Sequence, residues 1–204
     1  IDSAYWIESI AKALEMRKSI GLPSSYTNCY RLIHGEGDHL PGLIVDIYGK
    51  TAVIQAHSVG MYLARAEIAN ALETVFGDSL EAIYDKSSQT VPYKAFEGLK
   101  DEFLTGSVGK DVVCENSLKF KVDWELGQKT GFFLDQRDNR SLLGSFCSGK
   151  KVLNTFCYTG GFSVYALKGG ATLVDSVDAS AKAMQSCDEN VSHNFGPEIA
   201  TRHR

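Results

Sequence analysis

The sequence predicts an α/β protein: a small α+β domain over residues 1–110, then the first half of a parallel, doubly wound sheet over residues 111–204. The length of 204 residues is enough for two small domains. In the first part, short β-like runs gather around amphipathic helices, whereas in the second part strands and helices alternate. Such alternation is typical of parallel β-α-β units with right-handed crossovers.

The composition is that of an ordinary globular protein, with 44% hydrophobic and 23% charged residues. The apolar runs Gly42–Ile47 and Thr51–Ala56 are too short to span a bilayer, so we expect no membrane partner. Ile1–Trp6 lacks the basic and apolar regions of a secretory signal. Because no methionine precedes it, we expect that upstream sequence has been removed.

Five cysteines are scattered along the chain, and none forms a C-x-x-C pair. This pattern argues against a disulfide framework or a metal site, and it favours buried thiols in a reducing cytoplasm. The net charge of −4 lacks the basic footprint typical of nucleic-acid binding. A function on RNA therefore has to rest on motifs.

The first domain is predicted from local patterns. Ile7, Ile10 and Leu14 give the first helix its apolar face, and Pro23 cannot continue it. Gly49 suits a tight hairpin turn because glycine tolerates positive φ. In order, the predicted elements are a helix at 3–20, strands at 29–34, 42–48 and 51–57, a helix at 60–76, a strand at 80–84, and a loop or linker over 86–110.

In the second domain, Asp135 and Ser180 are predicted to cap helices. A hairpin should turn at Glu115-Asn116, and residues 151–156 should form a buried strand. In order, the predicted elements are strands at 112–114 and 118–122, a loop at 127–131, a helix at 135–146, a strand at 151–156, a helix at 161–167, a strand at 172–177 and a helix at 180–194.

The strongest chemical signal is the strand–turn–helix run Val152–Ser163, which contains the adjacent glycines Gly160 and Gly161. Glycine permits a ligand to approach the main chain, and the helix start offers N–H donors to a carboxylate or phosphate. Asp178, at the end of the next strand, could accept hydrogen bonds from the ribose hydroxyls of an adenosine cofactor.

An ordinary β-α-β unit with a glycine turn is the plain alternative for this run. A dinucleotide site is disfavoured because G-x-G-x-x-G is absent, and a Walker A loop is absent as well. A pocket for S-adenosylmethionine (SAM) needs one close backbone approach, so it fits better.

A second run, Gly127–Arg140, is dense in polar and aromatic residues. Its six consecutive polar residues, Asp135–Arg140, are too many for one solvated helix face, so some should point toward the neighbouring strand ends. Lys129 and Arg137 could pair with a carboxylate, which arginine can bind with two parallel hydrogen bonds. Phe132 and Phe133 are expected in the core.

The run GQKTGFFLDQRDNR, followed by VLNTFCYTGGFSVYAL, closely resembles the class I SAM-dependent methyltransferases of large-subunit ribosomal RNA, specifically the cytosine-5 methyltransferase I type. Residues 30–46, YRLIHGEGDHLPGLIVD, resemble the central domain of the same family. The resemblance implies a PUA RNA-binding domain, a central domain and a Rossmann-like methyltransferase domain. This chain is expected to begin after the first of these and to stop inside the third.

The resemblance also implies the residues that contact SAM. Asn154 departs from the general class I pattern, which has an acid at this position, and its interaction with the cofactor's ammonium should be weaker than a charged pair. The implied cofactor-binding residues are Lys129, Phe133, Gln136, Arg137, Asn154, Phe156, Cys157, Tyr158, Thr159, Gly160, Asp178 and Ala179.

By the same resemblance, the catalytic cysteine and an Asp-Pro-Pro motif are expected beyond Arg204, so no catalytic residue is assigned here and the fragment should be inactive alone. Cys157 belongs to the cofactor loop and is not expected to attack a base. Ribosomal RNA is the implied partner and the cytoplasm the implied location. The alternative is a non-catalytic RNA- or ribosome-binding module that retains the fold.

The strand at 151–156 should have a neighbour on one side only. Its unpaired backbone groups would favour coverage of this edge by a second copy in a homodimer, by a swapped segment or by the central domain.

Overall fold

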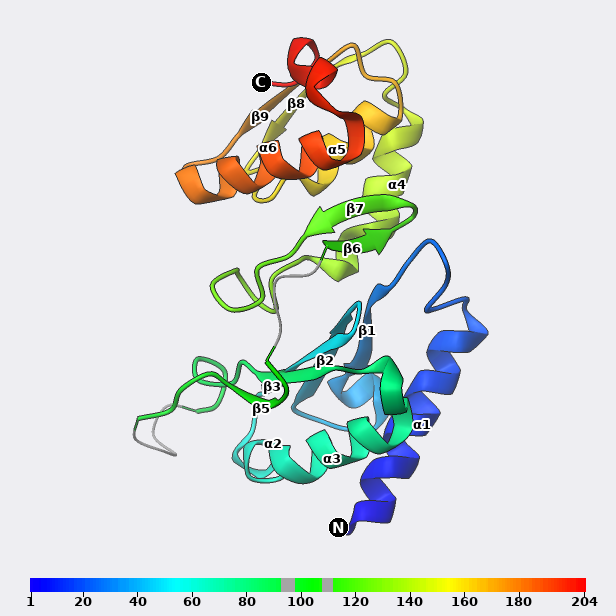
Figure 1. Ribbon diagram of the computed structural model, residues 1–204, viewed down its shortest axis with the longest axis vertical. Coiled ribbons are helices and arrows are strands. Elements are labelled where there is room, and N and C mark those ends of the chain that lie inside the picture. The colour runs from blue at the N-terminus through cyan, green and yellow to red at the C-terminus, as the bar shows by residue number, and fades with distance from the viewer. Residues whose placement is uncertain (93–97, 108–111) are drawn as a thin grey trace. The chain divides into compact units, whose positions relative to one another are not determined.

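The computed structural model describes residues 1–92, 98–107 and 112–204 (Figure 1). The described residues form two compact units: the first runs to residue 107 and includes Val122–Phe132, and the second comprises Val112–Lys121 and Phe133–Arg204. The sequence placed residues 122–132 in the second domain, whereas they pack with the first unit. The predicted boundary at residue 110 lies outside the described residues.

The first unit contains a five-stranded sheet in the order β1-β2-β3-β4-β5. Strands β3 and β4 are parallel, and the other neighbouring pairs are antiparallel. Its elements are α1 (Ser3–Ser19), β1 (Cys29–His34), η1 (Gly35–Asp38), β2 (Leu43–Tyr48), β3 (Thr51–Ala56), α2 (Val59–Leu63), α3 (Arg65–Phe76), η2 (Gly77–Ser79), β4 (Ala82–Asp85) and β5 (Glu102–Thr105).

Local sequence explains most of these elements, and the predicted first helix, three strands and hairpin are confirmed. Gly49 has a φ of 62° in the two-residue turn that pairs Tyr48 with Thr51. Helices α1 and α3 pack against each other, and their apolar side chains share one core with the sheet. Every residue of β3 is buried, because β2 and β4 flank it.

Three predictions for the first unit were wrong in detail. The predicted helix at 60–76 is divided into α2 and α3 at Ala64, and the strand predicted at 80–84 begins at Ala82. The segment predicted as a loop contains β5, which pairs antiparallel with β4. Tyr84 and Phe103 pack with their ring centroids 4.9 Å apart, a contact across the sheet that local periodicity cannot reveal.

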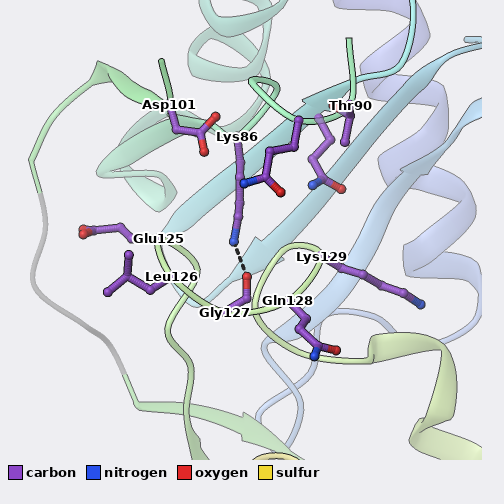
Figure 2. A pocket seen from close by; sticks show the side chains of 10 residues that line it. Lys86, Thr90, Asp101, Glu125, Leu126, Gly127, Gln128 and Lys129 are labelled. Atoms are coloured by element: carbon purple, nitrogen blue, oxygen red, sulfur yellow. Dashed lines mark hydrogen bonds between the residues drawn. The ribbon is translucent and has the colours of Figure 1, made fainter. Parts of the chain in front are cut away.

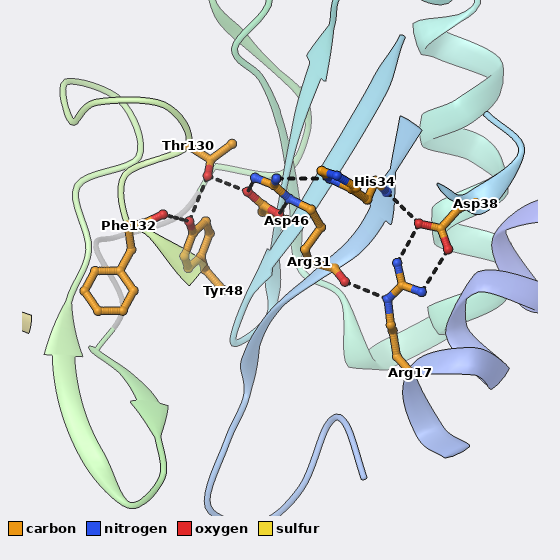
Figure 3. Close-up of polar contacts among 8 residues, drawn as sticks. All are labelled: Arg17, Arg31, His34, Asp38, Asp46, Tyr48, Thr130 and Phe132. Atoms are coloured by element: carbon orange, nitrogen blue, oxygen red, sulfur yellow. Dashed lines mark hydrogen bonds and ion pairs between the residues drawn. The ribbon is translucent and has the colours of Figure 1, made fainter. Parts of the chain in front are cut away.

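Residues 122–132 are held on the first unit by a polar network (Figure 3). Asp46, fully buried on β2, pairs with Arg31 at 2.8 Å and accepts from Thr130 Oγ1 at 2.6 Å. The Tyr48 hydroxyl lies 2.9 Å from Thr130 Oγ1 and donates to the Phe132 carbonyl at 3.3 Å. Burial, followed by the charge of Asp46, raises the pKa of Tyr48 well above its ordinary value, so this hydroxyl stays a donor.

The second unit contains a hairpin and a two-stranded parallel sheet. Its elements are β6 (Val112–Glu115), β7 (Leu118–Lys121), η3 (Leu134–Gln136), α4 (Arg137–Ser145), β8 (Lys151–Thr155), α5 (Gly161–Lys168), β9 (Leu173–Val177), α6 (Ala181–Phe195) and η4 (Pro197–Thr201). The predicted β-α-β-α order is confirmed, and Ser180 caps α6 by accepting from the Ala183 N–H.

Side chains from three helices anchor the hairpin. Arg140 on α4 binds Glu115 through two hydrogen bonds of 2.9 and 2.7 Å, and both side chains are almost fully buried. The Tyr165 hydroxyl on α5 donates to Glu115 at 3.0 Å. On α6, Asn190 and Asn194 accept from the backbone of β7 and so satisfy the edge of this strand.

Three details of the second unit differ from the sequence prediction. The hairpin turns at Asn116 and Ser117, which both have positive φ, rather than at Glu115-Asn116. Asp135 is not an N-cap, because Gln136 occupies that position without a capping side chain. Strand β8 is not buried: its residues alternate between exposed and half-buried, and Leu153 is 66% exposed.

Candidate cofactor site

The loop between β8 and α5, residues 156–160, has an unusual backbone. Phe156, Tyr158 and Gly160 have φ values of 57°, 49° and 79°, so two non-glycine residues occupy the left-handed region. The Cys157 N–H donates to the Val177 carbonyl at 3.1 Å, and the Gly160 N–H donates to the Cys157 carbonyl at 2.9 Å. Strain held in this way is concentrated at functional sites, which marks this loop as a candidate.

Asp178 lies directly after β9 and faces the same loop. Its carboxylate accepts from the Ser180 N–H at 2.9 Å and from the Tyr158 N–H at 3.0 Å. These backbone hydrogen bonds, that of Ser180 first, hold the pKa of Asp178 below its ordinary value. The carboxylate is therefore ionised at neutral pH and retains lone pairs for a further donor.

Gly160 has a packing role in addition to the ligand-approach role predicted from the sequence. A Cβ at this position would lie 2.4 Å from Cys187 Sγ and 3.1 Å from Cys187 Cα on α6, so Cys187 would have to shift to admit a side chain. The loop and α6 can thus pack closely because Gly160 has no side chain. Gly161 then begins α5, as predicted.

Asn154 on β8 begins a buried hydrogen-bond chain. Its Nδ2 donates to Ser163 Oγ at 2.8 Å, and Ser163 lies 2.7 Å from Ser176 Oγ on β9. Ser176 in turn lies 2.9 Å from His203 Nε2. Because the amide nitrogen is engaged by Ser163, the oxygen of Asn154 is the atom left to accept from a cationic group.

Of the predicted residues ahead of β8, Phe133 reaches the loop. Its ring meets the Tyr158 ring edge-on, with centroids 5.5 Å apart. Gln136 donates to Asp135 and accepts from Asn139, and Arg137 Nε lies 3.4 Å from Asp138. These contacts of Gln136 and Arg137 lie within their own segment.

The remaining predicted residues differ in exposure. Cys157 and Thr159 are buried, whereas Phe156 is 88% exposed and Ala179 is exposed. Lys129 belongs to the first unit, where it lines two hollows.

Sequence reasoning missed Asn190, a fully buried residue in the middle of α6. Its Nδ2 donates to the Thr159 carbonyl at 2.9 Å, and its Oδ1 accepts from the Lys121 N–H at 2.8 Å, so it ties the loop to the hairpin. Its spacing of four residues from Asn194 was the available signal, because two asparagines on one helical turn are costly unless they bond to something.

A parallel β-α-β unit with a tight loop after its first strand and an ionised acid after its second defines the class of Rossmann-like cofactor-binding proteins. The residues fit a cofactor that carries a sugar and an ammonium group. Asp178 supplies an acceptor for the sugar hydroxyls, and Asn154 supplies one for the ammonium.

The chain belongs to the S-adenosylmethionine-dependent methyltransferase family, whose sequence model matches residues 39–198. The cofactor of this family is SAM, as the sequence predicted. The chain is 38% identical over 199 residues to the ribosomal RNA large subunit methyltransferase I of Tolumonas auensis, a match that covers 95% of this chain and 49% of that protein. It thus spans about half the length of the curated relatives it matches.

Solved structures of methyltransferases share the fold of this chain. A SAM-dependent methyltransferase from Streptococcus mutans superposes with a TM-score of 0.83 at 28% identity, over 100% of this chain and 52% of that one. A methyltransferase solved in complex with S-adenosylhomocysteine (SAH) gives the same TM-score and identity, over 100% of this chain and 51% of that one. The predicted fold class is therefore confirmed. No helix within the described ranges is long and apolar enough to cross a membrane.

Proposed function

We propose that this chain is the cofactor-binding part of a methyltransferase that acts on large-subunit ribosomal RNA at cytosine carbon 5. The observation that carries the proposal is the ionised Asp178 facing the strained loop at residues 156–160. The named relative is a ribosomal RNA large subunit methyltransferase, which supports RNA as the substrate.

In this proposal Asp178 accepts the ribose hydroxyls, and Asn154 accepts from the ammonium of the methionine end. Phe133 supports the loop through Tyr158, with which it is in ring contact. The other proposed cofactor residues are Lys129, Gln136, Arg137, Phe156, Cys157, Thr159, Gly160 and Ala179.

Transfer to cytosine carbon 5 requires a thiolate that adds to carbon 6, after which carbon 5 takes the methyl group from the sulfonium and SAH leaves. Loss of the carbon 5 proton then expels the thiolate. Burial raises the pKa of Cys157 to about 12 and also raises the pKa values of Cys147 and Cys187, so these thiols are poor nucleophiles. We propose that the chain alone binds SAM without transferring its methyl group.

Three further features of the predicted assembly remain part of the proposal: a cytoplasmic location, division into domains near residue 110, and a partner for β8. Leu153, Phe156 and Val177 are 66%, 88% and 51% exposed around this strand, which supports pairing with a second copy or a swapped segment.

Calorimetric titration with SAM tests the proposal. We expect binding, competition by SAH, no competition by NAD, and an affinity lowered about tenfold or more by Asp178→Asn, because a hydrogen bond to a charged group contributes about 1.5–3 kcal/mol. Asp78→Asn, an exposed change on the first unit, is the matched control. Absence of SAM binding would refute the cofactor site.

A methylation assay on ribosomal RNA tests the second part of the proposal. We expect no transfer by this chain. Transfer would contradict the proposed inactivity, whereas SAM binding by a longer protein without transfer would favour the alternative of a non-catalytic RNA-binding module.

A further inference from the structure

The first unit contains a polar hollow that shares only Lys129 with the proposed cofactor residues. Its volume is about 460 Å³, within the range of small-molecule sites. It lies where the parallel strands β3 and β4 end, beside the segment 125–129 (Figure 2). We call it the amide hollow, and it is lined by Gln55, Lys86, Gln89, Thr90, Asp101, Glu125, Leu126, Gly127, Gln128 and Lys129.

Gln55 is the unusual member of this lining. It lies on β3 opposite Ile44, is only 8% exposed, and also lines an adjoining hollow of about 380 Å³. Among the described residues its side chain makes no hydrogen bond, and its amide is not one of the fully buried polar atoms that lack a partner, so it faces the hollow and solvent reaches it. A polar ligand in the hollow would therefore take the place of water at this amide.

The walls of the amide hollow are fixed by hydrogen bonds. Lys86 Nζ donates to the carbonyls of Trp124 at 2.5 Å and Gly127 at 2.6 Å, and Figure 2 shows its side chain extending to Gly127. On the other wall, Thr90 Oγ1 donates to the Ala56 carbonyl at 2.7 Å. These hydrogen bonds hold Lys86 and Thr90 in place, whereas the exposed Gln89 would be ordered when a ligand binds.

The lining selects the chemistry of the ligand. The ammonium of Lys86 is occupied by two carbonyls, and the carboxylates of Asp101 and Glu125 balance the charges of Lys86 and Lys129, so the lining has no net positive charge to favour a phosphate. Glutamine amides pair with the edges of bases, and carboxylates accept from exocyclic amino groups. Protein recognition of RNA by sequence relies on such contacts to unpaired bases.

We propose that the amide hollow binds an unpaired adenine or cytosine of the RNA substrate, read by Gln55 and Gln89 with a carboxylate accepting from its amino group. This inference rests on the proposed function and extends it, since it assigns a base-reading site to the first unit. Uracil lacks the amino group and binds more weakly.

Fluorescence anisotropy with short single-stranded RNA tests this assignment on the whole chain. The probes carry adenine, cytosine, uracil or an abasic position at their centre. We expect adenine and cytosine to bind about tenfold more tightly than uracil or the abasic probe, since a two-point base contact discriminates by about 1–3 kcal/mol. Gln55→Leu should remove this difference.

If Gln55→Leu fails to fold, Gln89→Ala provides a second test. Because Gln89 is exposed, this substitution should leave folding unaffected, and it should reduce the preference for adenine and cytosine over uracil. Gln185→Ala on α6, exposed in the second unit, should leave it unchanged. Equal binding of all four probes, absence of binding, or retention of the difference by both hollow variants would overturn the proposal. SAM titration of the same samples separates the two proposals, since loss of SAM binding with retained base preference refutes the cofactor site alone.

Discussion

Strands β3 and β8 are both predicted from apolar runs, yet they differ in how far their residues are buried. All residues of β3 are buried, because β2 and β4 flank it and helices α1 and α3 contribute to its core. Strand β8 pairs only with β9 among the described strands, and Leu153 stays 66% exposed. The difference teaches that an apolar run predicts a strand, whereas its burial depends on neighbours supplied by distant parts of the chain.

The comparison also concerns what stabilises each unit. Both units combine buried apolar side chains with buried polar contacts: Asp46 with Arg31 and Thr130 in the first unit, and Glu115 with Arg140 in the second. The substitutions below compare such contacts between the units, and stability is the free energy of unfolding in urea unless stated.

Glu115→Ala should have the largest effect. It leaves the almost fully buried Arg140 guanidinium without its counter-charge, which typically costs about 3–5 kcal/mol. Urea unfolding of the second unit measures this loss. Glu189→Ala is the control: it breaks a much more exposed pair with Lys121 and should cost less than about 1 kcal/mol. Equal losses would show that the buried pair has no special role.

Ile54→Ala and Leu153→Ala compare the two strands directly. Ile54 is fully buried, so removing its side chain should cost about 2–5 kcal/mol. In the dilute, unpaired chain, Leu153→Ala should change stability by less than about 0.5 kcal/mol, because most of this side chain is exposed. At high protein concentration the loss should grow, because the proposed pairing of the β8 edge would cover this side chain, and an equally small effect at both concentrations would contradict that pairing.

Thr130→Val should cost about 1–3 kcal/mol, because it removes a donor from the buried Asp46 carboxylate and a partner from Tyr48. The measurement is urea unfolding of the first unit. Thr74→Val on the exposed side of α3 is the matched change, expected within about 0.5 kcal/mol of the unaltered chain. If both variants behave alike, the network in Figure 3 does not hold residues 122–132 in place.

The smallest effect concerns pH. Because backbone donors lower the pKa of folded Asp178, its contribution to stability is present above the unfolded value and is lost as pH falls through the folded value. A carbon-13 NMR titration should give a midpoint for this carboxyl below its ordinary value of 3.8. A midpoint at or above that value would mean that the bonds from Ser180 and Tyr158 do not form.

The sequence by itself determined the features that depend on neighbouring residues. Strand Cys29–His34, the turn at Gly49 and the cap at Ser180 follow from periodicity, positive φ and a side-chain hydroxyl, all of which act within a few residues. The motif Val152–Ser163 also predicted a turn before the helix that begins at Gly161, and a strand that ends just before Asp178.

Only the tertiary structure decided which distant groups meet. Thr130 donates to Asp46, which lies 84 residues earlier in the chain. Gly160 packs against Cys187, and Asn190 in the middle of α6 donates to the Thr159 carbonyl. The sequence periodicity does not predict these contacts, because each depends on where two separate elements approach each other. For the same reason the exposure of β8 and the packing of residues 122–132 with the first unit could not be predicted from local patterns.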